Sequence, residues 1–140
     1  MKLLVVDDEL DIQYLFQQKF RREIKEGQIF IKYALNAMSA LEFLNTTQNL
    51  TEYCILTDIN MPEMDGLTLL SKIKEKNRLF RTVVISAYGD MENIRTAMNL
   101  GASDFITKPI DLKDLATTLE KITDQFNSLK EGIIAQKRMI

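Results

Sequence analysis

One short apolar run, residues 53–57, ends in the carboxylate of Asp58, and a turn that contains Pro62 and Gly66 follows at once. Burying an unpaired charge is costly, so a carboxylate is seldom placed at the end of a buried strand for packing alone. The position of Asp58 therefore indicates a chemical role.

Polar side chains also stand at the ends of other short apolar runs. They are Asp7, Asp8 and Glu9 after residues 2–6, Ser86 at the end of residues 82–86, and Lys108 after residues 104–107. In an open parallel sheet, ligands bind beyond the carboxyl ends of the strands. If these runs are parallel strands, at least three acids, a hydroxyl and an amine gather at that edge.

The types of these residues suit phosphoryl transfer. Neighbouring carboxylates raise each other's pKa and destabilise a site, and a hard divalent cation such as Mg²⁺ removes that conflict. The cation and Lys108 would place positive charge against a phosphoryl group, and Ser86 can donate a hydrogen bond to it. A carboxylate can attack phosphorus and form an acyl phosphate, and this chemistry needs positioning and charge neutralisation more than acid–base groups. The pattern predicts that Asp58 accepts a phosphoryl group.

Composition excludes several other kinds of site. The chain has 140 residues, which suits one domain, and its net charge of −2 gives no basic footprint for nucleic acid. It has no histidine, which excludes a Ser-His-Asp triad and a His-bound metal. Any metal would need oxygen ligands, which points to magnesium, calcium or manganese.

The cysteine count and the lengths of the apolar runs indicate the cellular compartment of the protein. The single cysteine, Cys54, is expected in the core and cannot form a disulfide within the chain, which fits a reducing cytosol. The apolar stretch before Asp7 is too short for a signal peptide. No run of about 20 apolar residues is present to span a membrane. We therefore expect a cytoplasmic protein that does not bind membranes.

Short apolar runs alternate with longer amphipathic ones. The expected strands are residues 2–6, 29–34, 53–57, 82–86 and 104–107. The expected helices are a stripe from Ile12 to Ile24 ended by Gly27, one capped by Asn36, residues 66–76, residues 91–100 closed by Gly101, and a long final helix capped by Asp111. Each crossover carries a helix, so we predict an α/β fold with a doubly wound, five-stranded parallel sheet of order 2-1-3-4-5.

Four segments together resemble the response-regulator receiver domain (CheY-like) of two-component signalling. They are VVDDE at 5–9, TDINMPEMDG at 57–66, ISAYGD at 85–90 and GASDFITKPI at 101–110. In this order and spacing they are highly specific, and the resemblance covers residues 1–125. It implies a flavodoxin-like fold.

The resemblance also implies roles for individual residues. Asp58 is the phosphoacceptor, and Lys108 pairs with the phosphoryl oxygens. Mg²⁺, or Mn²⁺ in its place, is bound by Asp58, by Asp8 directly, by Asp7 largely through water, and by the backbone carbonyl of Asn60.

Two further positions resemble the moving parts of the family. Ser86 follows the phosphoryl group, and Phe105 is the aromatic switch residue that turns inward. Lys108–Pro109 resembles a bond that is cis in the family. Tyr88, beside the site, could gate the loss of the phosphoryl group or be simply part-buried, and the sequence leaves both open.

The implied mechanism is a two-state switch. A sensor histidine kinase or a phosphotransfer protein presents phosphohistidine, and the receiver catalyses only its own phosphorylation and dephosphorylation. The face made by the helix at 91–100, the strand at 104–107 and the final helix then changes and controls an output or a partner. Such a protein is a signalling switch and not an enzyme with a separate substrate.

The last helix carries a heptad pattern. Its apolar positions are Leu112, Leu115, Leu119, Ile122, Phe126, Leu129 and Ile133. We expect residues 126–140 to extend from the receiver and to form a parallel coiled coil with a second copy, as a linker to an output domain absent from this chain. The alternatives are a helix folded back on the monomer and a frayed tail.

Two other functions would use a similar fold but fit these residues less well. A haloacid-dehalogenase-like, Mg²⁺-dependent phosphohydrolase also uses an aspartyl nucleophile, but its nucleophile typically follows the first strand in a DxD motif, where this chain has DDE at residues 7–9. A flavodoxin-like binding module would need a Gly- and Ser/Thr-rich phosphate loop after the first strand, which this chain lacks.

Overall fold

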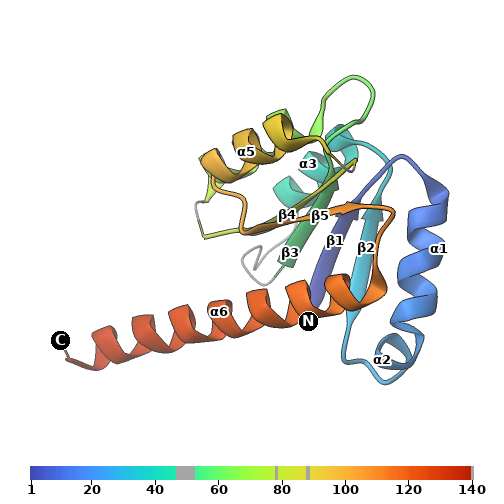
Figure 1. The fold of residues 1–140 in the computed structure, drawn as a ribbon. Helices are drawn as coiled ribbons and strands as arrows, with labels where there is room; N and C mark the ends of the chain where they lie inside the picture. The colour runs from blue at the N-terminus through green and yellow to red at the C-terminus, as the bar shows by residue number, and fades with distance from the viewer. Residues whose placement is uncertain (47–52, 78, 88, 140) are drawn as a thin grey trace.

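Five strands pair in parallel to form one sheet, in the order β2-β1-β3-β4-β5 (Figure 1). This computed structural model describes residues 1–46, 53–77, 79–87 and 89–139. The strands are β1 (Lys2–Val6), β2 (Phe30–Ala34), β3 (Tyr53–Asp58), β4 (Arg81–Ala87) and β5 (Asp104–Lys108). The predicted fold class and strand order are confirmed.

Six helices connect and cover the strands within the described residues. They are α1 (Leu10–Lys19), α2 (Arg21–Lys25), α3 (Ala37–Thr46), α4 (Gly66–Lys76), α5 (Met91–Asn99) and α6 (Leu112–Met139). Because α2 is counted separately, the face that the resemblance implicates is made here by α5, β5 and α6.

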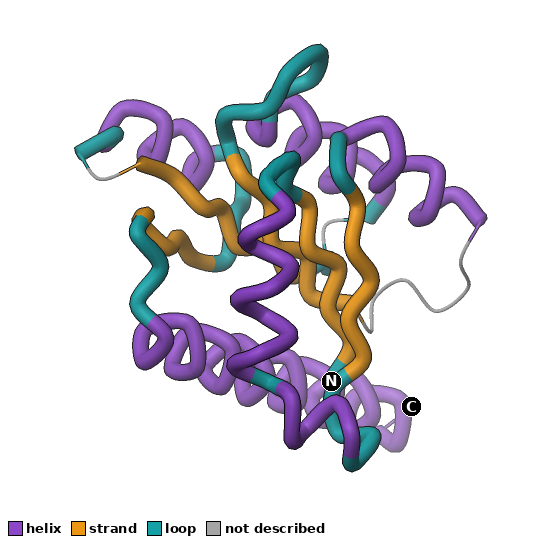
Figure 2. The backbone as a smooth tube through the Cα atoms, turned by 90° about the vertical axis from the view of Figure 1, so that its right-hand side faces the viewer, coloured by secondary structure: helices purple, strands orange, loops and turns teal. Residues whose placement is uncertain are grey.

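The alternation of side chains along the central strands builds two apolar layers. Leu3 and Val5 of β1 pack in a cluster with residues of α1 and α6, such as Phe16 and Leu115. Leu4 and Val6 face the other way, toward α3 and α4. Figure 2 shows α1 crossing in front of the strands. β3 is buried along its whole length, as expected for the central strand of a sheet covered on both faces.

Side-chain caps fix the starts of three helices. Asn36 accepts a hydrogen bond from the backbone N–H of Ser39, and Asp65 accepts one from Thr68. Asp111 accepts from the N–H groups of two residues in the first turn of α6. The predicted caps at Asn36 and Asp111 are thereby confirmed, and each satisfies backbone donors that a helix start leaves open.

The first helical stripe differs from its prediction. Instead of one helix from Ile12 to Ile24, the chain forms α1 and α2, with a bend at Phe20, where φ is −106° and ψ is 19°. Phe20 is buried and its ring lies 6.1 Å from that of Phe16. Ile24 is 37% exposed, so the buried stripe ends at the bend.

The last helix is the longest, at 28 residues, and it extends beyond the sheet toward the C-terminus (Figure 1). Its first turns bury Leu115, Leu119 and Ile122 in the core. Among the described residues, no helix combines the length and the apolar character needed to cross a membrane.

Candidate functional site

Three carboxylates meet at the carboxyl edge of the sheet, where β1 and β3 lie side by side. The register pairs Val6 with Thr57, so Asp7, just after β1, and Asp58, the last residue of β3, lie side by side at this edge. Asp8 joins them, and one ligand atom from each of the three lies within 4.8 Å of the others. Asp7 and Asp58 are buried, whereas Asp8 is exposed. This edge is also the switch point of the strand order.

The surroundings of the Asp7 carboxylate disfavour its ionised form. Burial raises the pKa of Asp7, and the nearby charge of Asp58 raises it further, while the hydrogen bond from Glu9 N–H and the charge of Lys108 act against the shift. Its Oδ1 accepts that N–H bond at 2.9 Å, but its buried Oδ2 has no hydrogen-bond partner. Three carboxylates with close oxygens, one of which accepts no hydrogen bond, are the kind of donor set that a hard cation such as Mg²⁺ prefers.

Lys108 supplies the positive charge of the site from the end of β5. Its ammonium donates a hydrogen bond to Asp58 Oδ2 at 3.0 Å, and it lies 3.4 Å from Asp7 Oδ2. It also lies 3.8 Å from the carboxylate of Glu9, which is exposed. Burial alone would lower the pKa of Lys108, but the hydrogen bond to Asp58 and the three negative charges raise it overall. The lysine is therefore held charged against Asp58.

The backbone around Asp58 is packed tightly. Asn60 N–H donates to Asp58 Oδ1 at 3.1 Å, which leaves Oδ2 to Lys108. At Gly66, the first residue of α4, an added Cβ would lie 2.2 Å from the backbone oxygen of Asp58. Only glycine fits this approach, so Gly66 fixes the distance between the loop and the end of β3. The sequence reading placed Gly66 in a turn and did not assign it to the site.

The hydroxyl of Ser86 is not directed at Asp58. Ser86 is fully buried at the end of β4, and its Oγ donates to Asp90 Oδ2 at 3.2 Å. Asp90 was not among the predicted site residues, although an acid just before a helix is a common cap. A sequence cannot show which way a serine hydroxyl points, so this pair was not foreseen.

The other predicted residues are placed as follows. Phe105 is 37% exposed on β5, and the Lys108–Pro109 peptide bond is cis. Asn60 is exposed beside Asp58, while Tyr88 lies outside the described residues. Cys54 is buried, as predicted, and burial raises the pKa of its thiol to about 12.

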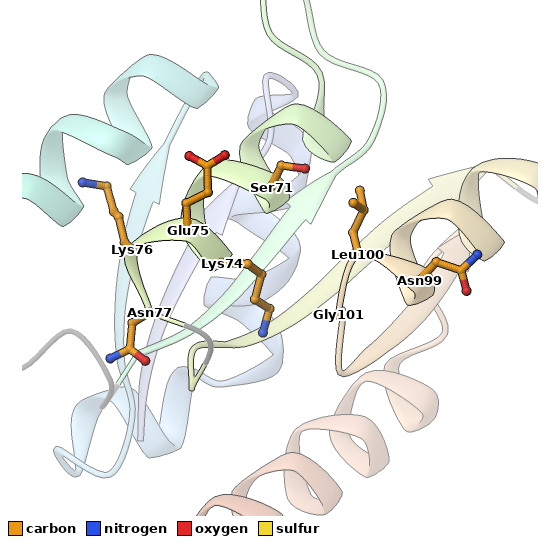
Figure 3. A pocket seen from close by; sticks show the side chains of 8 residues that line it. All are labelled: Ser71, Lys74, Glu75, Lys76, Asn77, Asn99, Leu100 and Gly101. Atoms are coloured by element: carbon orange, nitrogen blue, oxygen red, sulfur yellow. The ribbon is translucent and has the colours of Figure 1, made fainter.

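A hollow of about 780 Å³ lies away from these residues. It is lined by the C-terminal end of α4, including Lys74, by Asn77 directly after that helix, and by residues 99–101 at the end of α5 and just beyond it (Figure 3). Both segments lead into the amino ends of strands, so the hollow opens at the opposite edge of the sheet from Asp58. The acidic cluster, and not this hollow, carries the chemistry that the residue types suit.

Comparison with known proteins decides the family. The family model described as the response regulator receiver domain matches residues 3–120. The chain belongs to this family. Receiver domains are signalling switches that take phosphoryl groups from histidine kinases or phosphotransfer proteins, and they bind Mg²⁺ at an acidic pocket. The assignment favours the predicted receiver over the haloacid-dehalogenase-like alternative.

Individual relatives agree with this receiver assignment. The chain is 31% identical to sporulation initiation phosphotransferase F of Bacillus subtilis, over 86% of this chain and 91% of that protein. It is 30% identical to the DNA-binding transcriptional regulator NtrC of Proteus hauseri, over 91% of this chain but only 25% of that protein. The crystal structure of NtrX from Brucella abortus superimposes with a TM-score of 0.85 and 30% identity, over 99% of this chain and 30% of that one. The receiver thus spans most of one relative and under a third of the other two.

Proposed function

We propose that Asp58 is the phosphoryl acceptor of this receiver. The observation that carries the proposal is the hydrogen bond of 3.0 Å between Lys108 and Asp58 Oδ2, at a buried edge shared with Asp7 and Asp8. Asp7 lies 3.4 Å from the same ammonium. Among the described carboxylates of the site, Asp58 is the one that accepts a hydrogen bond from Lys108.

In the proposed transfer, an oxygen of Asp58 forms a bond to phosphorus as the bond from phosphorus to the imidazole nitrogen of the donor phosphohistidine breaks. That nitrogen keeps the electron pair of the broken bond. Lys108 sits where it can pair with the oxygens of the transferred group, and Asn60 N–H fixes the second oxygen of Asp58. The contribution of the protein is positioning and charge, as expected for phosphoryl transfer.

The residues that would hold Mg²⁺ are Asp7, Asp8, Asp58 and the backbone carbonyl of Asn60, and Mn²⁺ can take its place. Three carboxylates with mutually close oxygens support this assignment, as does the buried Oδ2 of Asp7, which accepts no hydrogen bond. When bound, the ion supplies positive charge against the acids and the phosphoryl oxygens.

For the switch, we propose that Ser86 turns toward the phosphoryl group and that Phe105 turns inward from its present partly exposed position. The face made by α5, β5 and α6 then changes and acts on a downstream partner. The phosphoryl group can shift the equilibrium between the inactive and active conformations only by the difference in its interaction free energy with the two.

We also propose that residues 1–125 form the receiver and that residues 126–140 extend it as a coiled-coil linker between two copies. The length of α6 supports this division, because the helix continues to Met139, far beyond the buried residues Leu115, Leu119 and Ile122 of its first turns. The superposition on NtrX, which includes nearly all of this chain within a much longer one, agrees with a linker role.

The test is the intact mass of the protein after incubation with acetyl phosphate and Mg²⁺, with Asp58→Asn as the matched variant. We expect a gain of one phosphoryl group that depends on Mg²⁺ and is absent in the variant. The gain should also disappear with EDTA. Equal gain by the wild-type protein and by Asp58→Asn would place the acceptor elsewhere.

A further inference from the structure

The side chain of Asp90 stands at the start of α5 but does not cap it. Asp65 and Asp111, at the starts of α4 and α6, accept hydrogen bonds from backbone N–H groups of their own helices. Asp90 occupies the equivalent position of α5 and makes no such bond. Its carboxylate is committed to other groups, although aspartate is among the preferred capping residues.

Those other groups are two side chains that donate to the same oxygen. Asp90 Oδ2 accepts from Ser86 Oγ at 3.2 Å and from Asn93 Nδ2 at 2.8 Å. Ser86 is fully buried, and both Asp90 and Asn93 are partly buried. A bond from a buried hydroxyl to a carboxylate is charge-assisted, which makes it stronger than a bond between neutral groups.

A serine hydroxyl has one proton to donate. While that proton is shared with Asp90, it cannot be donated to an oxygen on Asp58. We propose that Asp90 is a positioning residue that holds the Ser86 hydroxyl in the unphosphorylated state and competes with the phosphoryl group for it. This inference rests on the proposed function, because it takes Ser86 as the hydroxyl that follows the phosphoryl group.

The backbone links the same contact to α5. Asp90 N–H donates to the carbonyl of Ala87, the last residue of β4, at 3.2 Å. Two bonds therefore join the start of α5 to the end of β4, one through the backbone and one through Ser86. When the Ser86 hydroxyl leaves Asp90, only the backbone hydrogen bond between Asp90 and Ala87 still joins the two elements. Release of the hydroxyl therefore weakens the attachment of α5, which forms part of the face made by α5, β5 and α6.

The experiment measures occupancy of the site by beryllofluoride, a mimic of a phosphoryl group on a carboxylate, in the presence of Mg²⁺. Bound beryllofluoride is followed by ¹⁹F NMR in the full chain for the wild type, Asp90→Ala, Asp90→Asn, Ser86→Ala and the double variant Ser86→Ala/Asp90→Ala. Asp111→Asn, which changes an exposed aspartate that caps α6 instead of α5, is the matched control.

We expect Asp90→Ala to lower the half-saturating beryllofluoride concentration about 10- to 100-fold, the range expected when one competing hydrogen bond to a charged group is removed. Asp90→Asn should give a smaller decrease, because a neutral amide oxygen can still accept the proton. In the Ser86→Ala background the substitution should have no effect, since coupled residues lose their interaction energy when one partner is absent. Asp111→Asn should match the wild type.

An unchanged or weakened affinity in Asp90→Ala would overturn the inference and leave the proposed function standing. An equal gain in the Ser86→Ala background would also overturn it, because the gain would then come from removing a negative charge near the site. If the wild-type protein takes up neither beryllofluoride nor a phosphoryl group, the proposed function fails and this inference fails with it.

Discussion

At the scale of single residues, the buried carboxylate of Asp7 opposes folding when it is ionised. Its pKa is raised in the folded protein, first by burial and then by Asp58, so the folded state binds the proton more tightly than the unfolded chain. Between the two pKa values the folded state therefore holds more protons, and the free energy of unfolding falls as pH rises through that interval.

We predict that Asp7→Asn stabilises the metal-free protein at pH 7. The amide removes the charge that burial penalises, and its oxygen can still accept the hydrogen bond from Glu9 N–H. The gain should be about 1 kcal/mol, the usual size of a single substitution effect. Urea unfolding in EDTA measures it. A lower free energy of unfolding in the variant would mean that the ion pair with Lys108, 3.4 Å away, outweighs the cost of burial.

A second prediction separates Asp8 from its neighbour Glu9. Both are exposed acids next to Asp7, but only Asp8 belongs to the cluster of close carboxylates. Mg²⁺ at 100 times its dissociation constant should raise the free energy of unfolding of the wild type by about 2.7 kcal/mol. Asp8→Asn should lose most of this stabilisation and Glu9→Gln should keep it, as followed by thermal unfolding with and without Mg²⁺. Equal losses would show that the ion responds to overall charge instead of a defined ligand set.

The residues of the site were predictable to different degrees. Asp7, Asp58 and Lys108 could be assigned because each follows an apolar run, and parallel strands bring such positions to one edge. The contact between Ser86 and Asp90 could not, since it depends on side-chain orientation, which strand position does not determine. The role of Gly66 could not be predicted from the sequence, because its close approach to the backbone of Asp58 exists only when the loop between β3 and α4 is folded.

At the scale of elements, the loop between β3 and α4 determines where Asp58 is held. We predict that Gly66→Ala destabilises the protein by roughly 1–3 kcal/mol, the usual range for overpacking. The reason is that its Cβ would meet the backbone oxygen of Asp58 at 2.2 Å. The variant should also slow phosphorylation by acetyl phosphate, because the backbone of Asp58 must shift.

Gly27→Ala is the matched control for that prediction. Gly27 has a φ of +74° and open space around its Cβ position, so alanine there meets backbone strain alone. It should reduce stability by about 1 kcal/mol without altering the rate of phosphorylation. Urea unfolding and the time course of mass gain compare the two variants. A normal phosphorylation rate in Gly66→Ala would show that the loop can relax without moving Asp58.

The positions of strands and helices were easier to predict from the sequence than the bend within the first helical stripe. Strands followed from short apolar runs, and helix starts followed from Asn36 and Asp111, because both signals are local. The bend at Phe20 did not follow, because the spacing of apolar residues continues to Ile24 as it would in one straight helix. The ring of Phe20 packs on Phe16 in the core, and this tertiary contact accompanies the break between α1 and α2.

At the scale of the whole molecule, α6 is the helix for which we propose two roles, one in the receiver core and one as a linker. Leu115, Leu119 and Ile122 are buried in the core beside α1. The helix then continues through residue 139, so it spans about 40 Å in all at 1.5 Å per residue. A helix in a protein gains most of its stability from packing of its apolar face. A second copy would supply that packing to the end of α6 through the heptad pattern.

Gly132 offers a direct test of that second copy, because it lies inside α6 and is the least favourable helix residue apart from proline. Gly132→Ala should favour the helix by about 1 kcal/mol, whereas Gly132→Pro should break it at a cost of about 3 kcal/mol. Neither change touches the buried turns at Leu115 to Ile122, so the receiver itself should be unaffected. If the extension pairs two copies, sedimentation at tens of micromolar should show the dimer fraction rising in Gly132→Ala and falling in Gly132→Pro, with equal mass gain from acetyl phosphate. A monomer in all three proteins would mean that the extension does not associate with itself, and the length of α6 would then have to serve a contact with a different partner.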